Sequence, residues 1–170
     1  IYISDYMGDV MGTADFSYDY ESKFYDYYDN VLYTIRCYSI RENGQSSSRL
    51  FMDVFDLMGK VRKTKEADFS NLFGDGKITY PNSFQVLSDK EIMITADYRD
   101  EEVAVTKHLA IYMDYDFNVL RTVDIFPVVE QMEMVPEPGW AFQGTVIGDN
   151  MGNIYVCNDE LPIVNVVDEA

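Results

Sequence analysis

Residues 56–64 read Asp-Leu-Met-Gly-Lys-Val-Arg-Lys-Thr and directly follow an apolar run at residues 50–55. The pattern returns at residues 5–13, where Asp, Met, Gly, Val and Thr match, and at residues 114–122, where Asp, Val and Thr match. A fourth copy begins at Asp168, again after an apolar run. Each copy reads as a strand, a tight turn and a second strand, because Asp and Gly between apolar runs are turn-forming residues. The pattern predicts a repeat protein with several strands per unit, which is typical of a β-propeller.

The other strands keep the same period. Val31, Ile92 and Ile154 each begin an apolar run and lie 61 and 62 residues apart, a period similar to the 51, 58 and 54 residues between the repeated aspartates. Apolar runs at each strand position of the repeated unit are expected where sheets stack face to face and both faces of the strands are covered. The expected strands are residues 1–5, 10–15, 24–27, 31–40, 50–55, 61–65, 83–87, 91–97, 108–113, 119–126, 141–147, 154–157 and 162–167.

The predicted fold is all-β, with antiparallel four-stranded blades that form about three blades of a propeller as a partial arc. A blade remnant is expected at residues 1–15, whole blades at 16–66 and 67–126, and a partial blade at 127–170. The chain opens inside an expected strand and ends inside an expected turn. This arrangement predicts a piece of a longer or processed chain.

Four connections between the expected strands have a distinct composition. Residues 41–48 and 98–106 are polar and are expected to be loops, the first of them flexible. Residues 68–74 are expected to form one helical turn, capped by Asp68. Residues 127–139 contain three prolines and are expected to be an ordered loop.

The charge of the chain limits its partners. The formal net charge is -17, so the chain repels nucleic acid and anionic lipid surfaces, and binding to either is excluded. The acidity itself fits solubility, a cation site or a basic partner. Since no apolar run approaches the roughly 20 residues of a membrane helix, no membrane-spanning segment is expected.

Cys37 and Cys157 each lie in an apolar strand, which favours buried free thiols over a disulfide. A single histidine and the absence of a Cys-x-x-Cys motif argue against zinc.

Two segments resemble the repeats of six-bladed propellers of the NHL and TolB-like kind. They are residues 55–60 and residues 148–156, the second of which reads Gly-Asp-Asn-Met-Gly-Asn-Ile-Tyr-Val. Among these, the chain looks most like propeller proteins of gut Bacteroidetes, many of which are secreted lipoproteins. The resemblance implies an extracytoplasmic location at the periplasm or cell surface. It also implies a family that contains binding modules, sensors and enzymes, so it does not select one function.

In propellers of this kind, the loops between the second and third strands of a blade, and those between blades, gather on one face, which usually carries the ligand site. Trp140 beside tyrosines and acids suits carbohydrate stacking with hydroxyl hydrogen bonds, although it also suits packing against the next blade. A carbohydrate or a protein is therefore the expected ligand. The candidate ligand-binding residues are Tyr80, Tyr98, Arg99, Trp140, Asp159 and Glu160.

Other polar and aromatic groups have two interpretations each. Residues 97–102 and 114–118 contain the carboxylates that calcium requires, but a solvated loop and a hairpin turn explain them as well. The repeated aspartates are interpreted as turn formers that bond their own backbone. His108 stands alone, and no nucleophile elbow accompanies it, so no catalytic residue is predicted. The aromatic cluster is either a recognition surface or a half-exposed edge strand; it comprises Tyr18, Tyr20, Phe24, Tyr25, Tyr27, Tyr28 and Tyr33.

Three functions remain open on this basis. The first is a non-catalytic propeller binding module, which fits repeats without a catalytic constellation. The second is a propeller enzyme acting on glycans or lactones, with carboxylates and Arg99 on the loop face. The third is a structural or assembly segment of a larger propeller.

Overall fold

The structure is a computed structural model. It describes residues 2–4, 7, 9–13, 22–42, 45–56, 58–73, 78–100, 104–125, 127, 145–157 and 164–167.

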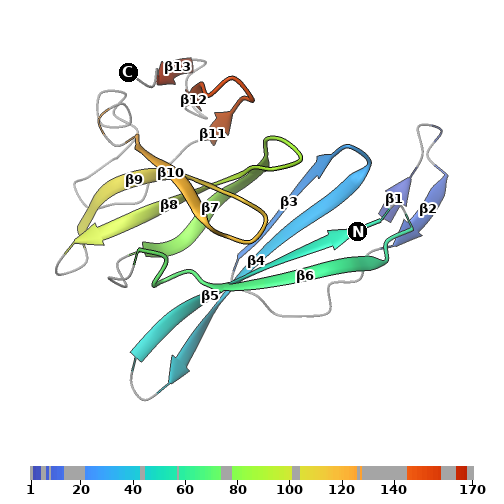
Figure 1. Cartoon of the computed structure of the whole chain (residues 1–170), viewed down its shortest axis with the longest axis horizontal. Helices are drawn as coiled ribbons and strands as arrows, with labels where there is room; N and C mark the ends of the chain where they lie inside the picture. Colours follow the sequence, from blue (N-terminus) through green and yellow to red (C-terminus); the bar gives the residue numbers. More distant parts are fainter. Residues whose placement is uncertain are drawn as a thin grey trace.

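All elements that the structure describes are β-strands, and every pairing is antiparallel (Figure 1). A hairpin pairs β1 (Tyr2–Ser4) with β2 (Val10–Thr13). Sheet 1 comprises β3 (Ser22–Tyr28), β4 (Val31–Glu42), β5 (Gln45–Phe55) and β6 (Val61–Asp68). Sheet 2 comprises β7 (Ile78–Val86), β8 (Ile92–Asp100), β9 (Ala104–Met113) and β10 (Val119–Asp124). Sheet 3 comprises β11 (Thr145–Gly148), β12 (Ile154–Cys157) and β13 (Val164–Val167).

The prediction of an all-β fold with four-stranded antiparallel sheets is confirmed. In each sheet the strands lie side by side in chain order, as short hairpin connections require. The strand expected at 154–157 begins and ends as predicted. The tight turn at Asp29 and Asn30 has positive φ at both residues, which is the geometry of a two-residue hairpin. Within the described residues the sheets do not close into a ring.

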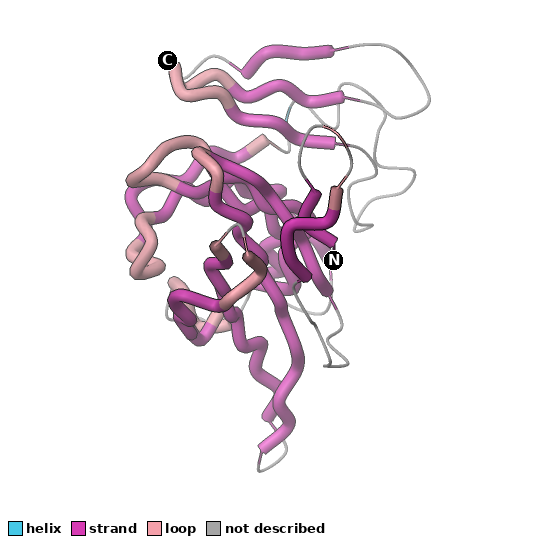
Figure 2. Tube along the Cα trace, turned by 90° about the vertical axis from the view of Figure 1, so that its right-hand side faces the viewer, coloured by secondary structure: helices cyan, strands magenta, loops and turns pink. Residues whose placement is uncertain are grey.

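The connection expected at residues 41–48 is mostly strand, so its prediction as a flexible loop is wrong. β4 and β5 stay paired as far as Glu42 and Gln45, and the hairpin extends beyond the other sheets (Figure 2). The carbonyl of Ser48 accepts a hydrogen bond from the amide of Phe69 at 2.7 Å, and its amide donates to the hydroxyl of Ser70. These bonds hold the polar start of β5 in an extended conformation, which its composition alone does not require.

Two further loop predictions change in the structure. Residues 69–73 form a turn after β6 instead of a helical turn, and Asp68, expected as its cap, is the last residue of that strand. The expected loop at 98–106 is shortened, because β8 extends to Asp100 and β9 begins at Ala104. Apart from residue 127, the proline-rich connection at 127–139 lies outside the described residues.

Sheet 2 lies between sheets 1 and 3, and both of its faces are buried. Ile92, Ile94 and Ala96 of β8 belong to the core that sheet 2 shares with sheet 1. Met93 belongs to a second core, shared with sheet 3, that includes Val156 of β12. Consecutive residues of β8 therefore face different partner sheets, which explains why its apolar run is nearly continuous. Figure 2 shows the strands of sheet 3 as a separate layer beyond the other sheets.

The first strands of consecutive sheets lie next to each other, β3 beside β7 and β7 beside β11 (Figure 1). Asp26 Oδ2 of β3 accepts a hydrogen bond from the amide of Val86 in β7, at 2.6 Å. Gln85 of β7 bonds both backbone groups of Gly148 in β11: its Nε2 donates to the carbonyl at 2.7 Å, and its Oε1 accepts from the amide at 2.9 Å. One polar side chain per sheet thus bonds the backbone of the next sheet, in addition to the apolar contacts between the sheets.

The outer face of sheet 1 holds a buried ion pair. The guanidinium of Arg36 on β4 pairs with the carboxylate of Asp53 on β5, and both side chains are more than nine-tenths buried. Asp53 also accepts a hydrogen bond from the hydroxyl of Thr64 at 2.6 Å, and the Arg36 guanidinium lies 5.7 Å from the ring centre of Phe51. Because the charges are paired and hydrogen-bonded, this group is a structural part of the sheet. Cys37, the next residue on β4, is buried and Cys157 is half-buried, and neither forms a disulfide.

Candidate functional site

The end of sheet 2 where β8 runs into β9 carries the two candidate residues whose side chains are described. Tyr98 of β8 pairs with Lys107 of β9, and Arg99 pairs with Val105 after a register shift. Both candidates are half-buried. Because successive side chains of a strand point to opposite faces, Tyr98 faces sheet 1, and Arg99 lies on the side of sheet 3.

The Tyr98 ring has apolar neighbours on one side and a positively charged neighbour on another. Its ring packs against the core between sheets 1 and 2, and the ammonium of Lys107 lies 5.8 Å from the ring centre. Lys107 itself is exposed. An aromatic ring flanked by a cation at the rim of a sheet suits a ligand with both apolar and hydrogen-bonding surface.

The other predicted site residues are placed only in part. Tyr80 lies in β7 between Ile78, which pairs with Tyr98, and Pro81, which pairs with Ala96, so its backbone is close to Tyr98. One register shift, between Ile78 and Pro81, spans Tyr80, and a second follows between Pro81 and Ser83. The candidates Trp140, Asp159 and Glu160 lie outside the described residues.

A buried polar cluster next to Arg99 was not predicted as a site. His108 Nδ1 lies 2.6 Å from Asp97 Oδ1, and both side chains are nearly fully buried. The amide nitrogen of Asn82 donates to the same carboxylate oxygen at 3.0 Å. A carboxylate bonded to one ring nitrogen fixes the orientation and tautomer of a histidine. The only hint in the sequence is the alternation of β8, which places Asp97 on the same face as Met93.

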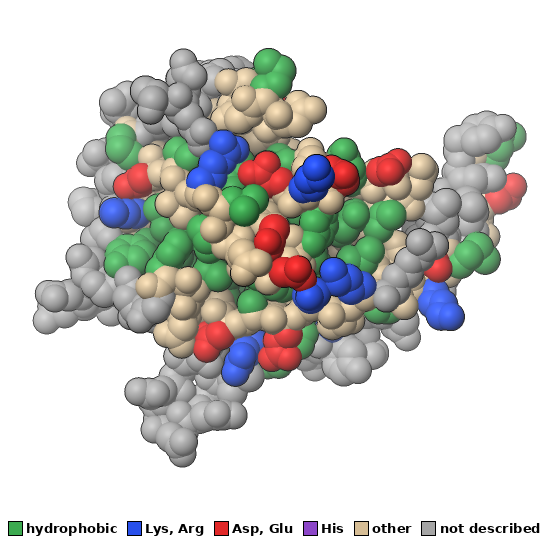
Figure 3. Space-filling model, viewed as in Figure 1, with side chains coloured by type: hydrophobic (Ala, Val, Ile, Leu, Met, Phe, Trp, Pro, Cys, Tyr) green, Lys and Arg blue, Asp and Glu red, His purple; other side chains and the backbone are tan. Residues whose placement is uncertain are grey.

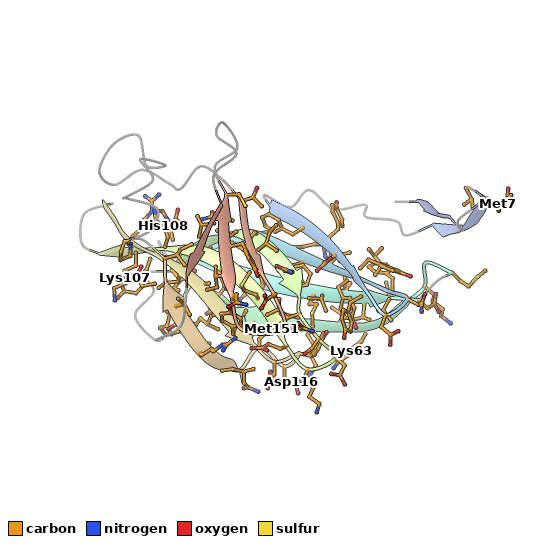
Figure 4. All side chains as sticks on the ribbon, turned by 90° about the horizontal axis from the view of Figure 1, so that it is seen from above. Met7, Lys63, Lys107, His108, Asp116 and Met151 are labelled. Atoms are coloured by element: carbon orange, nitrogen blue, oxygen red, sulfur yellow. The ribbon has the colours of Figure 1, made fainter. Side chains whose placement is uncertain are left out.

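The polar cluster continues along the face of sheet 2 that meets sheet 3. The hydroxyls of Ser83 and Thr95 lie 2.6 Å apart, one rung further along the sheet. Beyond them the face is apolar, with Met93 and Tyr112 forming the next rung. Figure 4 shows Lys107 and His108 together at one end of the stack, away from Met151 and Asp116. The face of sheet 2 that meets sheet 3 therefore has a polar end and an apolar end.

The described residues contain no group of three or more histidine, cysteine, aspartate or glutamate side chains that could hold a metal ion. In the segment 97–102, Asp97 is bonded to His108 and Asn82, and the side chains from residue 100 to 102 lie outside the described part. Acidic and basic side chains are interspersed on the face that Figure 3 shows.

The Asp114 carboxylate, the alternative calcium ligand, bonds its own turn. Its Oδ1 accepts hydrogen bonds from the amides of Asp116 at 2.8 Å and Asn118 at 2.9 Å, and its Oδ2 accepts from the side-chain amide of Asn118 at 2.8 Å. The Asn118 side-chain bond, followed by the backbone bonds, lowers the pKa of Asp114. The geometry agrees with the interpretation of these aspartates as turn formers.

The same turn occurs twice more in the described chain. Asp56 Oδ1 accepts from the amides two and four residues later, at 2.9 and 3.0 Å, and Asp149 Oδ1 does the same at 2.8 and 2.9 Å. The residue three positions after the aspartate has positive φ in all three turns: Gly59, Gly152 and, unexpectedly, Phe117. Hydrogen bonds from Asn153, first from its side chain, lower the pKa of Asp149 to about 2.

The aromatic cluster around β3 divides by strand alternation. Phe24, Tyr28 and Tyr33 pack against the core between sheets 1 and 2, whereas Tyr25 and Tyr27 are exposed. β3 is the edge strand of sheet 1, so these five residues fit the interpretation as a half-exposed edge. Tyr18 and Tyr20 lie outside the described residues.

Among the residues that the structure describes, no helix has the length and hydropathy needed to cross a membrane. Comparison of the chain with protein-family models, curated proteins and solved structures gave no match.

Proposed function

We propose that this chain is part of a β-propeller binding module that holds a carbohydrate at the β8–β9 end of sheet 2. Three sheets that stack through their first strands support the propeller arrangement, as does the sequence resemblance to NHL and TolB-like propellers. The observation that carries the binding site is that Tyr98 and Lys107 on one face of sheet 2, and Arg99 on the other, lie at the same end of the strands, beside the buried Asp97–His108 pair.

The chemistry of this end suits a sugar better than an extended apolar ligand. Tyr98 offers part of an aromatic face for stacking against a sugar ring, and Arg99 and Lys107 are hydrogen-bond donors for hydroxyl or carboxylate oxygens. The Asp97–His108 pair lies beneath the surface and holds β8 and β9 in register at this end. Rigid support of this kind keeps the cost of ordering a site low when a ligand binds.

Binding is tested with the whole chain and a panel of soluble neutral and uronic-acid oligosaccharides, by thermal shift and calorimetry. We expect one class of saccharide to raise the melting temperature. Tyr98→Ala and Arg99→Gln are each expected to weaken binding at least about tenfold. Lys90→Gln, at the opposite end of β8, is the matched control and is expected to bind as the parent does. Absence of binding by every saccharide, or equal binding by all variants, would contradict the proposal.

The Asp97–His108 pair favours a second candidate function, a propeller hydrolase acting on glycans or lactones. A carboxylate that orients a histidine is the base-and-orienter half of many hydrolytic sites. In this case, water would be the nucleophile. The histidine would accept a proton from the water during attack on a lactone carbonyl and would return it to the ring oxygen as the ring C–O bond breaks. Turnover of chromogenic esters, lactones and glycosides by the chain, lost in His108→Gln and retained in Lys90→Gln, would favour the hydrolase. A folded chain without turnover on any of these substrates would contradict the hydrolase and leave the binding module as the proposed function.

The resemblance to secreted propeller proteins also leads us to propose a location outside the cytoplasm. Fractionation of the cells that make the protein tests this directly. Recovery from the periplasm or the cell surface is the expected result, and recovery with the cytoplasmic proteins would contradict it.

A further inference from the structure

The contacts between sheets use equivalent positions in each sheet, which the register of the strands identifies. Leu32, Ile92 and Ile154 are equivalent, because each pairs with the last residue before a repeated aspartate. On the first strands, their partners are Tyr27, Val86 and Gly148. The residues just before these partners are also equivalent, and they are Asp26, Gln85 and Ile147.

In both interfaces between sheets, the residue at the Asp26 position of one sheet contacts the residue at the Tyr27 position of the following sheet. Asp26 bonds the backbone of Val86, and Gln85 bonds the backbone of Gly148. The third member, Ile147, is on the outer face of sheet 3 and is 44% exposed. It is apolar, so it cannot repeat the hydrogen bond and would contact the following sheet through its methyl groups.

Sheet 1, at the opposite end of the stack of sheets, carries the position that Ile147 would contact, which is Tyr27. Tyr27 on the outer side of sheet 1 is 58% exposed, and Tyr25 beside it is 46% exposed. The Tyr27 hydroxyl donates to the side-chain oxygen of Asn30 at 2.9 Å, which holds its ring in place. One end of the stack thus carries an exposed aliphatic side chain, and the other end carries a pair of exposed rings.

We propose that these two faces dock onto each other between two copies of this chain, head to tail, with Ile147 of one copy against Tyr27 of the next. The occupant is a second copy because the two faces are the two halves of an interface that the chain already forms twice within itself. This inference depends on the stacking of the sheets and is independent of the carbohydrate site, which lies at another end of sheet 2.

A contact between two different faces has consequences that distinguish it from a symmetric dimer. Such a contact leaves one face open on each end, so association continues into chains or a ring. The net charge of -17 opposes it. Association is therefore expected to strengthen with salt, since the screening length falls from about 10 Å at 0.1 M to about 3 Å at 1 M.

The test is sedimentation velocity of the chain over a range of concentrations at low and high salt. We expect concentration-dependent species larger than a monomer, favoured by salt. Ile147→Asp and Tyr27→Asp are each expected to weaken association at least about tenfold. Leu120→Asp is the matched control, because Leu120 is 55% exposed on β10 and lies outside both faces. It is expected to change association less than about twofold.

Mixing the two variants gives the sharpest result. Each variant alone lacks one face, but Ile147→Asp keeps the tyrosine face and Tyr27→Asp keeps the isoleucine face. The mixture is therefore expected to form a dimer and nothing larger. Circular dichroism confirms folding, and Ile147→Thr and Tyr27→Ser replace any variant that unfolds. A monomeric parent at all concentrations and salts, a mixture that stays monomeric, or an equal loss in Leu120→Asp would each overturn the proposal.

Discussion

Replacing Gln85 by leucine tests whether the contact between sheets 2 and 3 contributes to stability. The Gln85 side chain makes two hydrogen bonds to Gly148, at 2.7 and 2.9 Å, across 63 residues of sequence. Leucine has a similar length and is apolar, so it removes both bonds without opening a large cavity. The backbone of Gly148 is buried and would then lose two partners.

The size of the effect follows from the two bonds. An intramolecular hydrogen bond contributes about 1 kcal/mol net, and a buried polar group that is left without a partner costs about 1–3 kcal/mol. Partial burial of the leucine offsets some of this cost. We expect Gln85→Leu to lower the free energy of unfolding by about 2–4 kcal/mol.

Urea unfolding followed by circular dichroism measures the change, and hydrogen exchange at the amide of Val156 in β12 reports on sheet 3. The free energy of unfolding and the protection of this amide from exchange are both expected to fall in the variant. Lys90→Leu, in the exposed turn after β7, adds the same side chain without touching the interface and is expected to leave both unchanged. A change in Gln85→Leu below about 0.5 kcal/mol, with unchanged exchange, would refute the reasoning.

Three further predictions concern the turns. Phe117 has φ of 64° and is 6% exposed, so Phe117→Ala keeps the strained backbone and loses the buried ring, whereas Phe117→Gly loses the ring but relieves the strain. In urea unfolding, the glycine variant is expected to be more stable than the alanine variant by about 1 kcal/mol, the reverse of the usual order. The pKa of Asp149 is lowered to about 2, so its contribution to stability is complete above its ordinary value near 4 and is lost as the pH falls through 2. Asp149→Asn is expected to flatten the acid dependence of unfolding in that window, and carboxyl NMR titration of the parent checks the pKa. Burial, followed by the hydrogen bond with Tyr33, raises the pKa of Tyr115, whose hydroxyl donates to the carbonyl of Ser88 at 2.6 Å. Tyr115→Phe is therefore expected to reduce the absorbance change at the alkaline end of a spectrophotometric titration and to remove about 1 kcal/mol of stability.

The repeated turns were predictable because their determinants are local. An aspartate, and a glycine three positions later, specify the hydrogen bonds and the left-handed backbone of the turns at Gly59 and Gly152. The third turn departs from the rule at Phe117. Its ring belongs to the core between sheets 1 and 2, so tertiary burial holds a backbone conformation that phenylalanine disfavours by itself.

The polar contacts between strands and sheets were not predictable from local pattern. Asp97 and His108 are 11 residues apart, and they meet because β8 and β9 pair in one particular register. Asp26 and Val86 are separated by 60 residues and belong to different sheets. The length of the β4–β5 hairpin also depends on distant contacts, since the turn after β6 fixes the start of β5. For the proposed site, the sequence pattern named Tyr98 and Arg99 as candidates, which stays a prediction, and it did not name the buried pair beside them.

The face of sheet 2 that meets sheet 3 limits how the two sheets align. Successive rungs on this face are Met93 with Tyr112, Thr95 with Ala110, and Asp97 with His108, so the face changes from apolar to polar along the sheet. Sliding sheet 3 by one rung toward the polar end would move the apolar side chains of β12 away from Met93 and Tyr112, with which they share a core. The slide would also break both hydrogen bonds between Gln85 and Gly148, at a cost of about 1 kcal/mol each. The apolar burial of β12 and the bonds of Gln85 therefore select the same alignment of the sheets.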